Sequence, residues 1–163
     1  MATIRELLQQ DLIIEELAST DKKGVIGEFS RLIASTGRVR DEGELLRVLF
    51  ERESLGSTGI GGGVAIPHGK LPAITTMIVA FGRSSGGIDF ASIDGSPAHL
   101  FFLLVTPEDQ PGEHLRALAR ISRILKNPAL REGLMTASGR EELQRLIYEE
   151  DGKYPQPLPL QKR

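Results

Sequence analysis

The sequence contains no cysteine among its 163 residues, so it can form no disulfide. The same absence removes thiolate metal ligands, and the histidines His68, His99 and His114 are too scattered to form a local zinc motif. No apolar run approaches the ~18 residues that span a bilayer. Residues 1–14 also lack the basic start, apolar middle and cleavage site of a secretory signal. We therefore expect a cytoplasmic protein with no direct membrane insertion.

An excess of one charge sign is missing as well. The chain has 20 Lys and Arg against 22 Asp and Glu, a net charge of −2, and the two signs are interspersed. This pattern offers no electrostatic footprint for nucleic acid, so we expect a small-molecule or protein partner. The length suits one domain with one core, which we place at residues 1–150. The proline-rich segment 151–163 is predicted to be an extended, loosely docked tail.

Apolar residues recur at helical spacing in five segments. The predicted helices lie between Asp21 and Gly37, from Asp41 to before Gly56, from Pro111 to before Asn127, from Ala129 to Thr136, and from Ser138 to about residue 150. Asp41 with Glu44, and Ser138 with Glu141, have the spacing of helix-start capping signals. In the helix that starts at Pro111, the predicted buried face consists of Leu115, Leu118, Ile121 and Leu125, and the predicted solvated stripe consists of Arg116, Arg120 and Arg123.

Two runs of β-branched or aromatic residues, Thr75–Phe81 and Ala98–Val105, predict central strands. Between them, Asp94-Gly95 predicts a two-residue hairpin turn. Helices before, between and after a few strands favour an α/β or α+β sandwich with at least one helix layer on the sheet.

Several catalytic motifs fail on inspection. A phosphate-binding P-loop would need glycine at Val64 and Ser or Thr at Leu71, and the dinucleotide pattern G-x-G-x-x-G fails in both possible registers. Residues 82–86, GRSSG, match the hydrolase pattern G-x-S-x-G, but that nucleophile elbow needs a helix directly afterwards and Gly87-Ile88-Asp89 follows. We therefore reject a serine hydrolase.

Glycine occupies positions 59, 61, 62 and 63, just ahead of Pro67-His68. Two interpretations are open. Consecutive glycines can turn their N–H groups toward one point and cradle an anion, or they can simply permit a long turn. His68 likewise is either a hydrogen-bonded structural residue or a functional one, and Pro67 stiffens the segment from which it projects.

Residues 51–71, ERESLGSTGIGGGVAIPHGKL, resemble the active-site signature of the type-2 (fructose/mannitol) EIIA domains of the bacterial phosphoenolpyruvate-dependent phosphotransferase system, in particular those of the nitrogen branch. The order of elements from about Thr3 to Glu149 is similar too. The resemblance implies an α/β sandwich in which a mixed central sheet is flanked by helices, the phosphotransferase/anion-transport-like fold. One departure is Gly62, where relatives often have asparagine or another polar residue.

The resemblance also implies the site residues. His68 falls on the phosphoacceptor, carried as tele-phosphohistidine; Arg52 falls on the active-site arginine and His114 on a second active-site histidine. A neutral imidazole is a workable nucleophile, and phosphoryl transfer depends on donors aimed at the equatorial oxygens. The expected phosphate-binding groups are Ser57, Thr58, Gly59, Gly61 and Gly63. The plainer interpretation makes Arg52 a solvated residue beside Glu51 or Glu53, and His114 an exposed residue near Glu113.

The resemblance implies a phosphotransferase with an HPr-like phosphoprotein as donor and with neither a metal nor another cofactor. Two recipients are then open. In a nitrogen-branch protein, the phosphorylation state decides which regulatory partners dock. In a sugar-specific EIIA, the group passes to an EIIB and so to a transporter. The missing EIIB and membrane segments favour the regulatory protein, and the sequence identifies neither the sugar nor the regulated partner.

Overall fold

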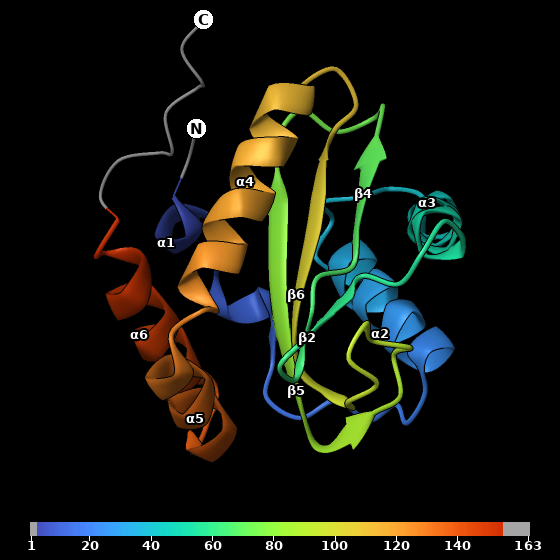
Figure 1. Cartoon of the computed structure of the whole chain (residues 1–163). Coiled ribbons are helices and arrows are strands. Elements are labelled where there is room, and N and C mark those ends of the chain that lie inside the picture. Colours follow the sequence, from blue (N-terminus) through green and yellow to red (C-terminus); the bar gives the residue numbers. More distant parts are fainter. Residues whose placement is uncertain (1–2, 155–163) are drawn as a thin grey trace, which may run out of the picture.

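The computed structural model describes residues 3–154, and within them it forms a mixed six-stranded sheet flanked by helices (Figure 1). The elements follow in the order α1 (Ile4–Leu7), η1 (Gln10–Leu12), β1 (Ile13–Ile14), α2 (Lys22–Ser35), α3 (Glu42–Ser54), β2 (Gly59–Gly61), β3 (Val64–Ala65), β4 (His68–Leu71), β5 (Ile78–Ile88), β6 (Ala98–Pro107), α4 (Pro111–Ile124), α5 (Pro128–Thr136) and α6 (Arg140–Asp151). This architecture confirms the expected sandwich. None of the described helices is long and apolar enough to cross a membrane.

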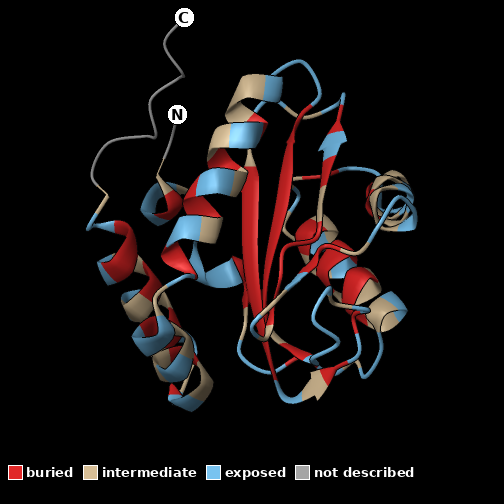
Figure 2. Ribbon diagram, viewed as in Figure 1, coloured by how far each residue is buried: buried red, intermediate tan, exposed pale blue. Residues whose placement is uncertain are grey.

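The sheet is built around the antiparallel pair β5 and β6. Its strand order is β1-β5-β6-β3-β2, and β4 continues beyond β3 along the same edge of β6. β1 runs parallel to β5, β3 and β4 run parallel to β6, and β2 runs antiparallel to β3. Helices α4, α5, α6 and α1 lie on one side of the sheet, and α2 and α3 lie on the other (Figure 1). Because both faces are covered, β5 and β6 are buried along almost their whole length (Figure 2).

Helices α2 and α3 begin where the sequence predicts. Asp21 accepts a hydrogen bond from the Gly24 amide, and Asp41 accepts one from the Glu44 amide, so each helix begins with a side-chain cap. The last helix differs, because its N-cap is Gly139 and Ser138 instead donates to Glu142 from both its amide and its hydroxyl. The predicted Ser138–Glu141 cap is therefore wrong by one residue.

The connection between β5 and β6 is longer than the predicted two-residue turn. β5 runs to Ile88, seven residues past the predicted strand end, and β6 starts at Ala98. Gly95 does adopt a positive φ of 74°, and its amide bonds to the Ser92 carbonyl, but this turn lies inside a loop. The GRSSG segment belongs to β5, so no helix follows its central serine, in agreement with the rejection of a hydrolase elbow.

The buried face of α4 is shifted from the predicted one. Leu115 is 67% exposed, so its placement in the core is wrong, and the buried residues of this helix are His114, Ala117, Arg120, Ile121 and Ile124. Arg120 was predicted in a solvated stripe and is instead 1% exposed. Its Nε donates to Asp151 Oδ1 at 2.6 Å, and its guanidinium also donates to the carbonyls of Asp151 and Tyr154.

The hydrogen-bonded pair of Arg120 and Asp151 involves the first residue of the predicted tail, 151–163. Asp151 is the last residue of α6 and is buried, and its Oδ2 accepts a hydrogen bond from the Arg5 amide at 3.1 Å. Residues 151–154 are thus joined to α4 and α1. The rest of the predicted tail, residues 155–163, lies outside the described residues.

Candidate active site

His68 opens β4, and α3 packs directly beside that strand. In the sheet register His68 pairs with Leu104 of β6, and the Leu104 amide bonds to the Pro67 carbonyl at 3.0 Å. Gly69 permits the close approach of α3, since a Cβ there would come within 3.1 Å of Val48 Cγ2. The last turn of α3 consequently brings Arg52 to the imidazole of His68.

Both ring nitrogens of His68 have a hydrogen-bond partner. Nδ1 lies 2.7 Å from the Ile66 carbonyl oxygen, and Nε2 lies 3.2 Å from Nε of Arg52. A carbonyl oxygen only accepts and a guanidinium only donates. Nδ1 therefore carries the proton and Nε2 keeps its lone pair. Burial lowers the pKa of His68 below its ordinary value, and the Arg52 charge acts in the same direction. The Ile66 bond opposes them, and the ring is neutral at neutral pH.

Arg52 is held by the turn that follows α3. Its guanidinium donates from Nη1 to the Gly56 carbonyl at 2.8 Å while Nε donates to His68. The neighbouring Glu51 pairs with Arg47 at 2.9 Å instead. The interpretation of Arg52 as a solvated residue with a surface carboxylate partner is therefore wrong.

His114 reaches the same place from the first turn of α4. Its ring centroid lies 5.3 Å from that of His68, and its Nδ1 lies 2.6 Å from the Thr106 hydroxyl. Burial lowers the pKa of His114 to about 4, with the charges of His68, Lys70 and Arg52 adding smaller effects. His114 is 6% exposed, so the interpretation of it as an ordinary exposed residue is also wrong.

Glu53 orders the loop that leads from α3 to the glycines. Its side chain is 5% exposed, accepts from Lys22 Nζ at 2.8 Å and from the Thr58 amide at 3.3 Å, and also accepts from the Thr58 hydroxyl. Thr58 in turn accepts the Ile66 amide on its carbonyl at 3.0 Å. This chain of bonds connects Glu53 to the residue whose carbonyl holds Nδ1 of His68. From the sequence, Glu53 is expected only as a possible surface partner of Arg52, because its place at the end of a charged helix gives no signal of burial.

The expected phosphate-binding groups are mostly engaged with other parts of the chain. The Ser57 hydroxyl donates to the Phe90 carbonyl at 2.6 Å and accepts from the Gly59 amide at 3.0 Å. Thr58 is bound to Glu53 as described above. For these three residues, the phosphate contact stays a prediction.

The triple-glycine turn lies farther along the sheet. Gly61 and Gly63 adopt φ of 92° and 82°, in the left-handed region that favours glycine. The adjoining Val64 pairs with Leu100, whereas His68 pairs with Leu104. Four strand residues correspond to about 13 Å at ~3.3 Å each. The positive φ angles agree with the interpretation of this turn as a conformational requirement, and the phosphate binding of Gly61 and Gly63 stays a prediction.

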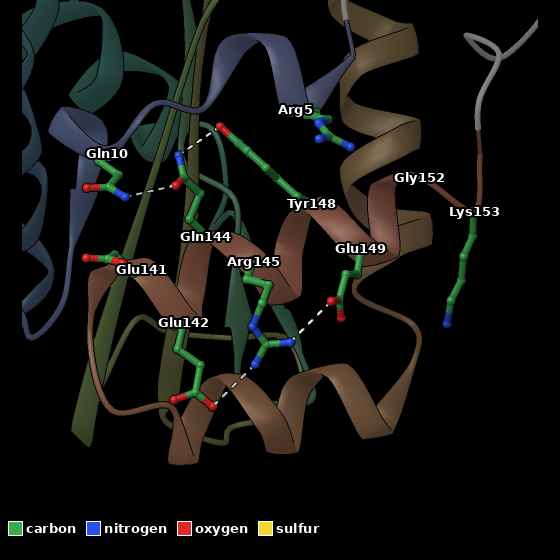
Figure 3. Close-up of a pocket in the computed structure, with 10 residues that line it drawn as sticks. All are labelled: Arg5, Gln10, Glu141, Glu142, Gln144, Arg145, Tyr148, Glu149, Gly152 and Lys153. Carbon is green, nitrogen blue, oxygen red and sulfur yellow. Dashed lines mark hydrogen bonds and ion pairs between the residues drawn. The ribbon is translucent and has the colours of Figure 1, made fainter.

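A separate groove of about 990 Å³ lies beside α6, on the far side of α4 from β4 (Figure 3). Several of its polar side chains are paired with one another. Gln144 bridges Gln10 and the Tyr148 hydroxyl, and Arg145 pairs with Glu142 and Glu149. The groove lacks the pairing of an arginine with an imidazole lone pair that is found at His68.

Comparison with known proteins gives the family to which this mixed sheet with flanking helices belongs. A model of the family "Phosphoenolpyruvate-dependent sugar phosphotransferase system, EIIA 2" matches residues 6–150. The chain belongs to this family, as the signature around His68 predicts.

The relatives include both nitrogen regulatory proteins and sugar-specific EIIA components. The chain is 42% identical over 125 residues to a nitrogen regulatory protein of Bradyrhizobium diazoefficiens, covering 76% of this chain and 80% of the relative. It is 37% identical to a fructose-specific EIIA component of Haloferax volcanii, covering 85% and 90%. It is 36% identical to the fructose-specific EIIABC component of Bacillus subtilis and spans only 23% of that protein, against 91% of this chain.

The crystal structure of the nitrogen regulatory protein IIA-Ntr from Neisseria meningitidis superposes with a TM-score of 0.83 at 35% identity, covering 88% of this chain and 98% of that one. The expected membership of the type-2 EIIA group, with nitrogen-branch proteins among its relatives, is therefore confirmed.

Proposed function

We propose that this protein is a phosphocarrier that accepts a phosphoryl group on Nε2 of His68 from an HPr-like phosphohistidine protein. One observation carries the proposal: the Ile66 carbonyl holds the proton on Nδ1, which leaves the Nε2 lone pair at the Arg52 guanidinium. The Nε2 lone pair attacks phosphorus, the donor's P–N bond breaks, and its electron pair returns to the donor imidazole. Both carriers are imidazoles, so the transfer balances in atoms and charge without a cofactor.

Arg52 and His114 are proposed to stabilise the charge that spreads over the equatorial oxygens. Arg52 is permanently charged, and moving its Nε–H from Nε2 to a phosphoryl oxygen exchanges one acceptor for a more negative one. His114 is neutral because it is buried, so it contributes a hydrogen bond and adds no positive charge. Positioned donors of this kind are worth about 10²–10³ in rate each.

The proposed role is regulatory, because relatives with 42% and 35% identity are named nitrogen regulatory proteins. Phosphorylation adds about −1.5 to −2 charge at an otherwise positive site and so changes which proteins dock there. Transfer to an EIIB is the alternative, favoured by the relative named as a fructose-specific EIIA component.

The common step is tested by mixing the protein with a phosphorylated HPr-type donor and following acid-labile label into intact protein. We expect His68→Ala to take up no label. His99→Ala is the matched control, because His99 bonds through Nδ1 to the Ser84 carbonyl at 2.9 Å and plays no part in the proposed transfer. Label that persists in His68→Ala, or is lost only in His99→Ala, contradicts the proposal.

The two recipients are separated by adding a purified fructose-type EIIB to the labelled protein. Slow or absent transfer supports the regulatory role. Onward transfer within seconds supports the sugar-specific alternative while leaving His68 as the phosphoacceptor.

A further inference from the structure

We propose that Thr106 is a positioning residue that fixes the neutral Nε2–H form of His114, so that His114 presents a hydrogen-bond donor to the phosphoryl group. This inference rests on the proposed function of His68, and it assigns a role to a residue that lies just beyond the predicted strand Ala98–Val105 and belongs to no sequence motif.

The placement of Thr106 is set by the sheet. It is the next-to-last residue of β6, pairs with Lys70 of β4, and is fully buried. α4 begins four residues after β6 ends, and its first turn lays His114 back over the strand end. The Thr106 hydroxyl and Nδ1 of His114 meet at 2.6 Å. Among residues 3–154 this is the hydroxyl's one hydrogen bond.

In the hydrogen bond between Thr106 and His114, the hydroxyl is the donor. If Nδ1–H donated to the hydroxyl oxygen, the hydroxyl proton would lack an acceptor in a fully buried position, which is unfavourable. If the hydroxyl donates to Nδ1, both groups are satisfied. A neutral imidazole carries one proton, so this arrangement leaves that proton on Nε2.

The two imidazoles of the site are then held as opposite tautomers by two different hydrogen-bond partners. A carbonyl oxygen, that of Ile66, keeps the proton of His68 on Nδ1 and leaves Nε2 as nucleophile. A hydroxyl donor, that of Thr106, keeps Nδ1 of His114 unprotonated and leaves Nε2 as donor. Because the rings lie 5.3 Å apart, a phosphoryl group on one falls within reach of the other.

The protonation form is tested first, on the unphosphorylated protein, by ¹⁵N NMR of the histidine side chains at neutral pH. We expect the His114 Nδ1 resonance at an unprotonated position and the Nε2 resonance at a protonated one. The reverse assignment overturns the proposal. This readout needs no donor, so it stands even if His68 proves not to be the phosphoacceptor.

The consequence for transfer is tested with Thr106→Val, which keeps the side-chain shape, and with Thr106→Ser, which restores the hydroxyl. We expect the maximal transfer rate of Thr106→Val to fall roughly 10- to 100-fold, while the KM for the phosphorylated donor protein stays within about twofold. The rate falls because the Nε2–H group of His114 is misplaced, and the KM is kept because the docking surface is intact. Thr106→Ser should recover most of the rate. Thr136→Val, at an exposed threonine of α5, is the matched control.

Two results would overturn the positioning role. One is a wild-type transfer rate in Thr106→Val, and the other is a Thr106→Ser protein as slow as Thr106→Val despite an unchanged melting temperature. If Thr106→Val fails to fold, the NMR assignment of the wild type and the Thr106→Ser rate still decide.

Discussion

Replacing Arg52 tests the charge arrangement of the site most directly, because its guanidinium makes one contact for folding and one for chemistry. Nη1 holds the Gly56 carbonyl and Nε holds the nucleophilic nitrogen of His68. In Arg52→Gln, loss of these half-exposed hydrogen bonds costs about 1–2 kcal/mol of folding stability. Loss of a positioned cationic donor costs about 10²–10³ in transfer rate. At 1.36 kcal/mol per tenfold, this corresponds to about 3–4 kcal/mol of transition-state stabilisation.

Arg52→Lys separates charge from geometry. Lysine keeps the positive charge but is a point donor that lacks the planar fork, so it does not hold both acceptors at once. We therefore expect a rate between those of the wild type and Arg52→Gln. The matched control is Arg47→Gln, which removes an arginine from the same helix whose partner is the surface carboxylate of Glu51. Its rate should stay within twofold of the wild type.

The pH dependence gives an independent check on Arg52. Attack requires neutral His68, and the neutral fraction falls as the pH drops through the His68 pKa. In the wild type that pKa is lowered by burial and by the Arg52 charge, so the transfer rate should fall at a pH below the range in which an ordinary histidine titrates. Removal of the charge in Arg52→Gln raises the pKa, so the acid limb should move to higher pH, whereas Arg52→Lys should leave it nearly in place.

The assay is rapid-quench measurement of phosphoryl transfer from a phosphorylated HPr-type donor between pH 4.5 and 8, with melting curves of each variant. A wild-type rate in Arg52→Gln refutes the placement of Arg52 in the reaction. An acid limb that stays at the same pH in Arg52→Gln refutes the electrostatic coupling of Arg52 to His68.

The sequence predicted the helices well where local signals and burial agree. Caps at Asp21 and Asp41 mark true helix starts, because a short side chain bonding to a nearby amide is a local interaction that needs no tertiary contact. The α4 face failed for the opposite reason. Hydrophobic spacing does not predict burial of the polar residues His114 and Arg120, and their burial is made favourable by distant partners, Thr106 and Asp151.

The site itself was predicted only as far as residue types and motif order allow. The motif around His68 predicts that His68 and Arg52 belong to one site, and the structure places the two side chains in hydrogen-bond contact. Thr106 and Glu53 were missed because no sequence signal marks a threonine just past an apolar run, or a glutamate in a charged helix end, as buried and hydrogen-bonded to a neighbouring element. For the glycines, phosphate binding stays a prediction. Their positive φ angles report a backbone requirement, which the sequence shows equally well whether or not a ligand lies there.

Three further changes test the structure away from the reacting atoms. Asp151→Asn removes the carboxylate charge beside Arg120 in a pair that is only 2% and 1% exposed, and we expect a loss of about 3–5 kcal/mol in urea denaturation; a loss under 1 kcal/mol would contradict the pairing. Leu115→Ser alters an exposed side chain next to His114. If the donor protein docks over the histidine pair, the KM for that protein should rise roughly 3- to 10-fold at an unchanged melting temperature, since a lost apolar contact weakens binding by about 1 kcal/mol. An unchanged KM places Leu115 outside the interface. Gly62→Asn tests the glycine turn: Gly62 has a φ of 66°, which asparagine tolerates, and a Cβ would meet nothing within 4 Å, so stability should change by less than about 1 kcal/mol. Because the turn lies about 13 Å along β6 from His68, the transfer rate should also stay the same, and a tenfold change in rate at unchanged stability would return the glycine turn to the phosphate site.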